Sequence, residues 1–269
     1  MQQNKLRELW RSGRPTINGW CSIGDPFVAE IMAAQGFDSM TIDLQHGALD
    51  YSDLLPMYQA MRASGATLMA RVPWLDPAAI MKALDAGAMG IICPMISTRA
   101  DAEEFVSYMR YPPLGQRSFG PTRAVFAHEG YGVEANQETL AIVMIETAEA
   151  AENLEEIAST PGLDGIYVGP ADLTLGTQRG RLPPGLDREE PEMVELIQRI
   201  AKVCAKNEIG ACIHCLTPEY AAKAVSWGFN LTTIGGDVRF LASAASHSIG
   251  TFHKLVGHQE SPDQVDAGY

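Results

Sequence analysis

The chain has 269 residues, of which 46% are hydrophobic and 20% charged, so it can bury a large core and is neither disordered nor fibrous. Its 20 Lys and Arg against 33 Asp and Glu give a formal net charge of −13, which argues against binding to nucleic acid or to an anionic membrane. The five irregularly spaced cysteines indicate reduced thiols and a cytoplasmic protein. The polar N-terminus and the lack of any apolar run approaching ~20 residues predict no export signal and no membrane span.

Short apolar or β-branched runs alternate with longer amphipathic segments along the whole chain, a pattern typical of a parallel sheet covered by helices. We predict strands at residues 17–22, 39–43, 67–72, 89–94, 140–146, 164–169, 209–214 and 231–235. Their starts lie on average about 31 residues apart, close to the ~30 residues of a βαβ unit. The sequence therefore predicts an α/β fold, a single (β/α)8 TIM barrel over residues 1–256, with 257–269 as a flexible C-terminal tail.

Capping signals indicate where five helices begin. Three capping side chains stand before a proline at the first helical position, in Asp25-Pro26, Asp76-Pro77 and Thr217-Pro218. Thr98 and Thr147 predict two further starts. Two connections are long: residues 111–138 follow a helix and start at the amino end of the barrel, whereas residues 173–190 follow a strand and lie at the carboxyl end, where barrel enzymes bind substrates.

Several chemistries find little support. No lysine falls on a predicted strand, which argues against Schiff-base catalysis. Phosphate-binding glycine motifs and the GxSxG nucleophile elbow are missing, and Gly235-Gly236 after the last strand is a weak phosphate signal. Cys212 and Cys215 form a CxxC motif without the second ligand pair that zinc sites usually need, so we interpret them as buried barrel cysteines.

Polar residues follow four of the predicted strands at their carboxyl ends. They are Asp43 and His46, Arg71, Glu146, and the segment Gly169, Pro170, Ala171 and Asp172. Taken singly, each has a structural explanation: a carboxylate at a helix N-terminus, an arginine–carboxylate pair or a turn histidine. Because the carboxyl ends of all barrel strands meet at one mouth, we interpret these residues together as one active site.

This set of residues suits enolate chemistry. Glu146 and Asp172 follow neighbouring strands and offer oxygen ligands to a hard divalent cation, leaving positions for a 2-oxo acid that chelates through two oxygens. The metal would act as a Lewis acid, and Arg71 would face the developing oxyanion. The helix start at 169–172 would offer backbone N–H groups to the substrate carboxylate, and His46 is the candidate proton carrier.

Five segments carry a family resemblance: IDLQHG at 42–47, ARVPW at 70–74, YPPLGQRS at 111–118, MIET at 144–147 and GPADL at 169–173. Over roughly residues 16–256 the chain resembles the HpcH/HpaI family of metal-dependent 2-oxo-acid aldolases. The resemblance implies a phosphoenolpyruvate/pyruvate-type barrel in which Glu146 and Asp172 bind Mg²⁺, Mn²⁺ or Co²⁺. It also implies that His46 is the general base and that Arg71 stabilises the enolate.

The same resemblance implies that Asp43 and Asp85 tune or orient the histidine, Asp85 across a subunit contact. It further implies a homo-oligomer, a hexamer or trimer, with an exchanged C-terminal helix at 238–256. Three positions depart from the family pattern: Gln45 replaces a glutamate, Met144 replaces a substrate-binding glutamine, and Ala171 replaces a serine of some relatives.

The sequence therefore predicts a class II aldolase that reversibly cleaves a 4-hydroxy-2-oxo acid into pyruvate, or hydroxypyruvate, and an aldehyde. One alternative is an acyl-CoA ester lyase of the citrate lyase β or malyl-CoA type, which Arg179 and Arg181 favour and the net charge disfavours. The other alternative is a non-catalytic barrel that binds a small metabolite.

Overall fold

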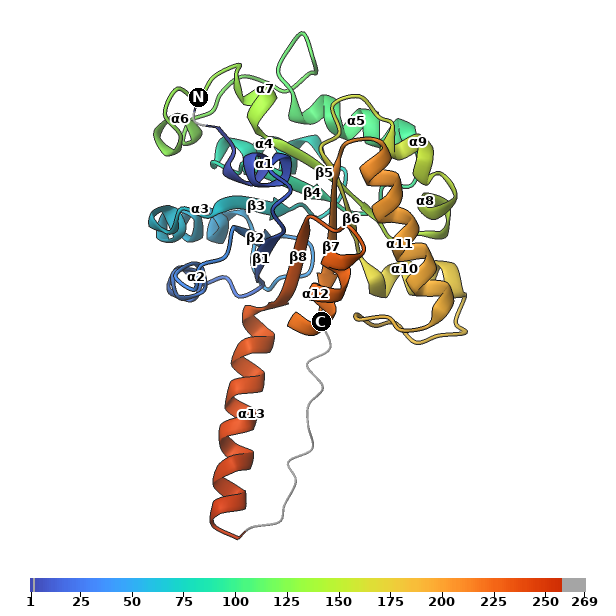
Figure 1. Ribbon diagram of the computed structural model, residues 1–269. Helices are drawn as coiled ribbons and strands as arrows, with labels where there is room; N and C mark the ends of the chain where they lie inside the picture. Colours follow the sequence, from blue (N-terminus) through green and yellow to red (C-terminus); the bar gives the residue numbers. More distant parts are fainter. Residues whose placement is uncertain (2, 258–269) are drawn as a thin grey trace.

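The computed structural model describes residue 1 and residues 3–257. Eight parallel strands pair in sequence order, and β8 returns to β1 to close a barrel (Figure 1). The strands are β1 (Thr16–Cys21), β2 (Ser39–Asp43), β3 (Thr67–Arg71), β4 (Gly90–Cys93), β5 (Leu140–Ile145), β6 (Gly165–Val168), β7 (Gly210–Cys215) and β8 (Leu231–Gly236). The predicted TIM barrel is confirmed, and every strand end agrees with its predicted position to within one residue. Nearly all of the predicted tail, residues 258–269, lies outside the described residues.

Helices surround the barrel and connect its strands (Figure 1). They are α1 (Lys5–Arg11), α2 (Pro26–Ala33), α3 (Tyr51–Ala60) with the 3₁₀ turn η1 (Met61–Ser64), α4 (Pro77–Asp85), α5 (Arg99–Met109), α6 (Ala124–Ala127), α7 (Ala135–Glu138), α8 (Ala148–Glu152), α9 (Leu154–Ala158), α10 (Pro170–Gln178), α11 (Pro191–Lys206), α12 (Pro218–Ser226) and α13 (Asp237–Leu255). All five predicted helix starts are confirmed, because the N-cap side chains of α2, α4, α5, α8 and α12 accept hydrogen bonds from first-turn N–H groups.

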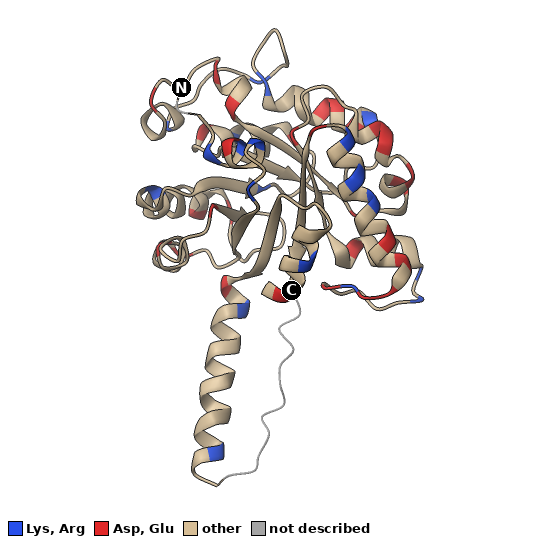
Figure 2. Cartoon of the chain, in the orientation of Figure 1, with Lys and Arg blue, Asp and Glu red and all other residues tan. Residues whose placement is uncertain are grey.

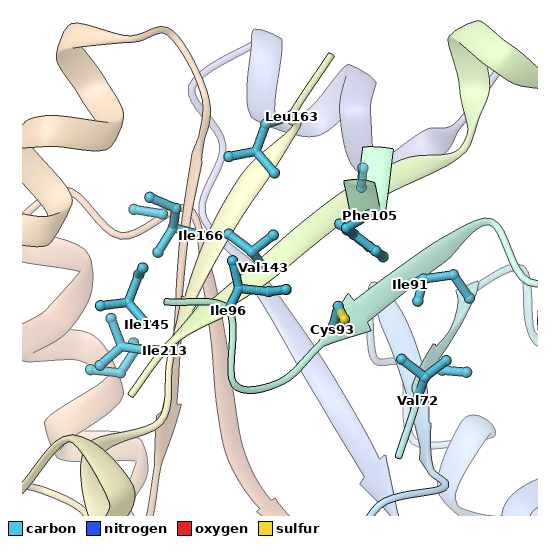
Figure 3. Packing of buried hydrophobic residues seen from close by; sticks show 14 of the residues in the cluster. Val72, Ile91, Cys93, Ile96, Phe105, Val143, Ile145, Leu163, Ile166 and Ile213 are labelled. Atoms are coloured by element: carbon cyan, nitrogen blue, oxygen red, sulfur yellow. The ribbon is translucent and has the colours of Figure 1, made fainter. Parts of the chain in front are cut away.

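The core has two layers, because side chains alternate between the two faces of each strand. The outer layer lies between strands and helices, where Val143, Ile145 and Ile213 belong to the same buried cluster as Phe105 of α5 (Figure 3). The inner layer fills the barrel with residues such as Trp20, Met69, Met144 and Tyr167. A helix-covered parallel sheet is therefore buried on both faces, which fixes the strand ends at the mouth.

The cysteines fit this arrangement. All five are buried and free. Cys212 belongs to the inner layer and Cys215 to the outer layer, so the CxxC side chains lie on opposite faces of β7 and cannot bind one ion. The interpretation as buried barrel cysteines is confirmed.

The long connection 111–138 stays at the amino end of the barrel. Arg117 in this connection forms a 2.6 Å ion pair with Asp85 at the end of α4. The backbone N–H of Asn4 donates to Glu138 at 2.7 Å, which joins the connection to the N-terminal segment. This segment therefore packs opposite the mouth rather than over it.

Helix α13 projects away from the carboxyl end of the barrel (Figure 1). Of its 19 residues only Asp237 is buried, while Leu241, Ile249 and Phe252 are at least half exposed. Its charged residues lie near its two ends (Figure 2). Among the helices that the structure describes, none is both long and apolar enough to cross a bilayer.

Candidate active site

The mouth begins with a turn that β2 makes as it ends. The Oδ1 atom of Asp43 accepts the backbone N–H groups of Gln45, at 3.1 Å, and His46, at 3.3 Å. Gly47 closes the turn, and a Cβ at this position would lie 2.3 Å from the carbonyl oxygen of Asp43, so only glycine fits. This turn leaves the His46 side chain exposed at the mouth.

Asp43 and Arg71 form a buried bidentate ion pair. They face each other across β2 and β3, with Nε to Oδ1 at 2.8 Å and Nη2 to Oδ2 at 2.6 Å. The guanidinium also lies 4.8 Å from the centre of the Trp20 ring, whose Nε1 donates to Asp43 at 3.3 Å. Arg71 therefore holds one fixed orientation, and its Nη1 makes none of the hydrogen bonds found among the described residues.

The pair stays charged despite its burial. Burial raises the pKa of the Asp43 carboxyl, but the hydrogen bonds and charge of Arg71 and the N–H groups of the turn outweigh it and hold that pKa below its usual range. Burial lowers the pKa of Arg71, and Asp43 more than compensates. The mouth therefore contains a fixed cation at neutral pH.

Glu146 lies directly after β5 and is 3% exposed. Its Oε1 accepts the backbone N–H of Met95 at 2.6 Å, and it forms no ion pair with any described residue. The pKa of Glu146 is raised to about 7, mainly by burial and also by the charge of Asp172, although the hydrogen bond from the Met95 N–H and the charge of Arg71 act in the opposite direction. The negative charge of a buried carboxylate next to a second carboxylate is poorly compensated until a cation binds.

Gly169 brings the start of α10 against this carboxylate. A Cβ at Gly169 would lie 2.8 Å from Oε2 of Glu146 and 2.9 Å from Cε of Met144. Pro170 opens the helix, and the first bond of its ladder runs from Leu173 N–H to the Gly169 carbonyl. The N–H of Ala171 comes before the first hydrogen bond of the helix and so has no partner within the helix. Asp172 is half-buried in the same turn.

The two carboxylates fit a hard divalent cation. The described residues contain no group of three or more His, Cys, Asp or Glu side chains that could hold an ion. The charge of Asp172 acts on Glu146, so these two carboxylates lie near each other at the mouth. Carboxylate oxygens are the ligands that Mg²⁺ and Mn²⁺ prefer, and two of them leave most of an octahedral shell to water and substrate. The raised pKa of Glu146 is the observation that favours an ion here.

His214 is a site residue that the prediction from sequence missed. It lies on β7 beside the mouth, where its ring centre is 4.9 Å from that of Trp20 and its Nδ1 is 3.2 Å from the Tyr167 hydroxyl. Burial and then the charge of Arg71 lower the pKa of His214 to about 3, so the ring is neutral. His214 and Cys212 lie two residues apart and so share the inner face of β7, but the sequence alone does not show which face of this strand is the inner one.

Asp85 is not brought to this site within one chain. It ends α4 at the amino end of the barrel, where it pairs with Arg117, whereas His46 is at the carboxyl end. Of the positions that depart from the family pattern, Met144 is buried inside the barrel, and Gln45 has a buried side-chain oxygen with no hydrogen-bond partner.

Known proteins resemble the chain over most of its length. The "Hydroxypyruvate/pyruvate aldolase" of Rhizorhabdus wittichii is 38% identical over 255 residues, covering 94% of this chain and 100% of that protein. The "2-keto-3-deoxy-L-rhamnonate aldolase" of Salmonella gallinarum is 31% identical over 257 residues, covering 94% of each. The crystal structure of an HpcH/HpaI aldolase/citrate lyase family protein from Burkholderia cenocepacia superimposes with a TM-score of 0.85 at 29% identity, covering 93% of this chain and 100% of that one.

The family pattern of HpcH/HpaI aldolase/citrate lyase matches residues 18–244. That range runs from within β1 to the first turns of α13, so it includes the carboxyl ends of all eight strands. The chain therefore belongs to the HpcH/HpaI aldolase/citrate lyase family, as its motifs predicted.

Proposed function

We propose that this enzyme, a metal-dependent aldolase, reversibly cleaves a 4-hydroxy-2-oxo acid into pyruvate or hydroxypyruvate and an aldehyde. The observation that carries the proposal is the presence, at one barrel mouth, of the fixed Arg71 cation and of a buried glutamate, Glu146, with a pKa near 7. The relative from Rhizorhabdus wittichii, named for hydroxypyruvate and pyruvate, supports these two products.

His46 is the proposed general base. It would take the proton of the C4 hydroxyl, the C3–C4 bond would break, and its electron pair would pass toward the C2 oxygen of the 2-oxo acid. Arg71 would donate from Nη1 to that developing oxyanion, while Asp43 keeps the guanidinium charged and oriented. Return of a proton to C3 completes the cleavage.

Glu146 and Asp172 are the proposed ligands of a divalent cation, with Mg²⁺, Mn²⁺ and Co²⁺ as candidates. When bound, such an ion supplies a Lewis acid for the keto and carboxylate oxygens of the substrate. The start of α10, Gly169 to Asp172, would bind the substrate carboxylate through backbone N–H groups. Met144 offers no amide to the substrate, so recognition of the carboxylate would depend on these N–H groups.

The two alternatives have less support. An acyl-CoA lyase needs a basic groove for the phosphates of coenzyme A, and the net charge of −13 disfavours such a groove. Named relatives at 28–38% identity are aldolases rather than binding proteins.

Product release tests the proposed reaction. A panel of 4-hydroxy-2-oxo acids is incubated with enzyme that has been stripped of metal and with enzyme reloaded with Mn²⁺, and pyruvate and hydroxypyruvate are measured. We expect release only from the reloaded enzyme and little from its His46→Ala variant. Full activity of the stripped enzyme would refute the mechanism, whereas exchange of the pyruvate methyl protons in D2O without cleavage would refute the substrate class alone.

We also propose a homo-oligomer, either a hexamer or a trimer. A lone projecting helix with exposed Leu241, Ile249 and Phe252 leaves apolar surface in water, which a second copy would cover by exchange of α13. In such an assembly, Asp85 of one chain would reach His46 of another. Mixing two inactive variants, His46→Ala and Asp85→Asn, tests this arrangement, because mixed assemblies contain some sites with both residues and should regain activity.

A cytoplasmic location is the proposal that fits the cysteines. All five are buried and unpaired, as expected in a reducing compartment. Fractionation of cells that produce the tagged chain tests it.

A further inference from the structure

A cavity of about 200 Å³ opens at the amino end of the barrel, opposite the catalytic mouth. Its lining includes Thr67, at the start of β3, and Met89, just before β4. The N-terminal segment, the turn η1 and the connection that contains α6 also contribute lining residues. None of its lining residues belongs to the catalytic mouth of the same chain.

The lining is basic although the chain as a whole is strongly acidic. Four of the lining residues are Lys5, Arg62, Arg123 and His128, and none is an aspartate or glutamate. Lys5, Arg62 and Arg123 form no ion pair with any residue that the structure describes.

Backbone carbonyls hold the three cationic side chains in place. The bonds run from Lys5 to Gly65 at 3.2 Å, from Arg62 to Phe126 at 3.0 Å, and from Arg123 to Ala86. Each bond uses one N–H group, so most donors of each guanidinium and ammonium group remain for a ligand. Lys5 and Arg62 are exposed and Arg123 is half-buried, and none of the three is neutralised by an ion pair with a described residue.

Tyr58 provides a second, independent observation. It lines the same cavity and is fully buried, yet its hydroxyl has no hydrogen-bond partner. A buried hydroxyl without a partner destabilises a fold unless a ligand or water completes it. The charges of Arg123 and Arg62 add to burial in lowering the pKa of His128, so both arginines act on the same part of the lining.

We propose that this cavity binds a small oxyanion of the phosphate class at a site separate from the catalytic mouth. A dianion would neutralise Lys5, Arg62 and Arg123 together and accept charge-assisted hydrogen bonds from their remaining N–H groups. Solvent does not reach the Tyr58 hydroxyl, so it would donate to the same oxygens once the side chains that cover it shift on binding. Inorganic phosphate and the phosphoryl group of an organic metabolite share this chemistry, and their relative affinities separate them.

Calorimetric titration of the full-length enzyme with inorganic phosphate, with and without Mg²⁺, tests the site. We expect binding that does not depend on Mg²⁺ and that Arg62→Glu weakens by about 10- to 100-fold. Tyr58→Phe, which removes only a hydroxyl, should weaken phosphate binding by a smaller factor. This variant also tests the site if the charge reversal in Arg62→Glu impairs folding. Tighter binding of glycerol 2-phosphate than of phosphate would identify an organic phosphate as the ligand, and equal binding would identify inorganic phosphate.

Two control variants distinguish binding in this cavity from a general charge effect and from binding at the catalytic mouth. Lys202→Glu on α11 changes the net charge as much as Arg62→Glu but lies outside the cavity, and Arg71→Ala removes the cation of the mouth. Both should bind phosphate as the unmodified enzyme does. Absence of binding to the unmodified enzyme, an equal loss in Lys202→Glu, or dependence on Mg²⁺ or Arg71 would overturn the proposal. So would dissociation of the oligomer by Arg62→Glu without phosphate binding, since a carboxylate from a second copy would then occupy the cavity.

Discussion

The contact between Gly169 and Glu146 allows a test of the site by a single methyl group. In Gly169→Ala the new Cβ would lie 2.8 Å from Oε2 of Glu146 and 2.9 Å from Cε of Met144, whereas ordinary contacts begin near 3.4 Å. Both neighbouring atoms are ends of flexible side chains, so each would retreat by about 0.5 Å and the backbone would stay in place. Gly169 has a φ of −97°, which alanine also adopts without strain.

The expected loss is larger in function than in stability. A 1 Å error in a catalytic site costs about 100-fold, so a shift of half that size should lower kcat/KM and the affinity for Mn²⁺ by about 10-fold each. Replacement of an N-cap glycine and the small overlap should cost about 1 kcal/mol, or about 2–4 °C in Tm. Steady-state kinetics, Mn²⁺ titration followed by electron paramagnetic resonance and a thermal melt measure the three quantities.

Gly120→Ala is the matched control, because a Cβ at Gly120 meets no atom within 4 Å. It should leave kinetics and metal affinity unchanged. The reasoning fails if Gly169→Ala keeps the metal affinity of the unmodified enzyme, or if its activity falls only in proportion to a loss of folded protein.

Three further changes test the mouth. Asp43→Asn leaves the buried Arg71 uncompensated and should destabilise the protein by about 3–5 kcal/mol in urea unfolding; a loss below about 1 kcal/mol would mean that the pair is not held as described. In metal-free protein, the stability due to protonated Glu146 is present below its ordinary pKa of 4.5 and is lost as the pH rises through about 7. The free energy of unfolding of Glu146→Gln should therefore rise by about 3 kcal/mol relative to that of the unmodified protein across that pH range. A difference that does not depend on pH would contradict the raised pKa. His46→Ala changes an exposed residue, so it should lower kcat by about 10²- to 10⁴-fold with unfolding nearly unchanged, and an unaltered kcat would exclude His46 as the base.

Strand positions were predictable because each strand of a helix-covered barrel is buried on both faces and reads as a short apolar run. The β5 run from Leu140 to Ile145 is entirely apolar and entirely buried. Helix starts were equally readable, since Asp25 and Thr98 cap their helices through contacts with residues two or three positions away. Both signals depend on residues that are close together in the chain, so they can be recognised in the sequence.

Pairings between distant residues were less readable. That Asp43 and Arg71 lie at strand ends was predictable, but their bidentate contact depends on the register of β2 against β3. The place of His214 depends on which face of β7 looks into the barrel, and a six-residue strand with a mixed pattern does not decide this by itself. Asp85 was assigned to the site by resemblance, and the fold of one chain puts it at the other end of the barrel.

The sequence by itself determined the (β/α)8 barrel, the family and the set of polar residues at the strand ends, because these follow from local burial patterns and short motifs. Only the tertiary structure decided the electrostatics. The raised pKa of Glu146 depends on its burial beside Asp172, and the uncompensated cations of the amino-end cavity belong to segments as far apart as Lys5 and His128. The strength of a charge interaction depends on the distance between the charges in the folded chain and on their burial, and positions along the sequence give neither.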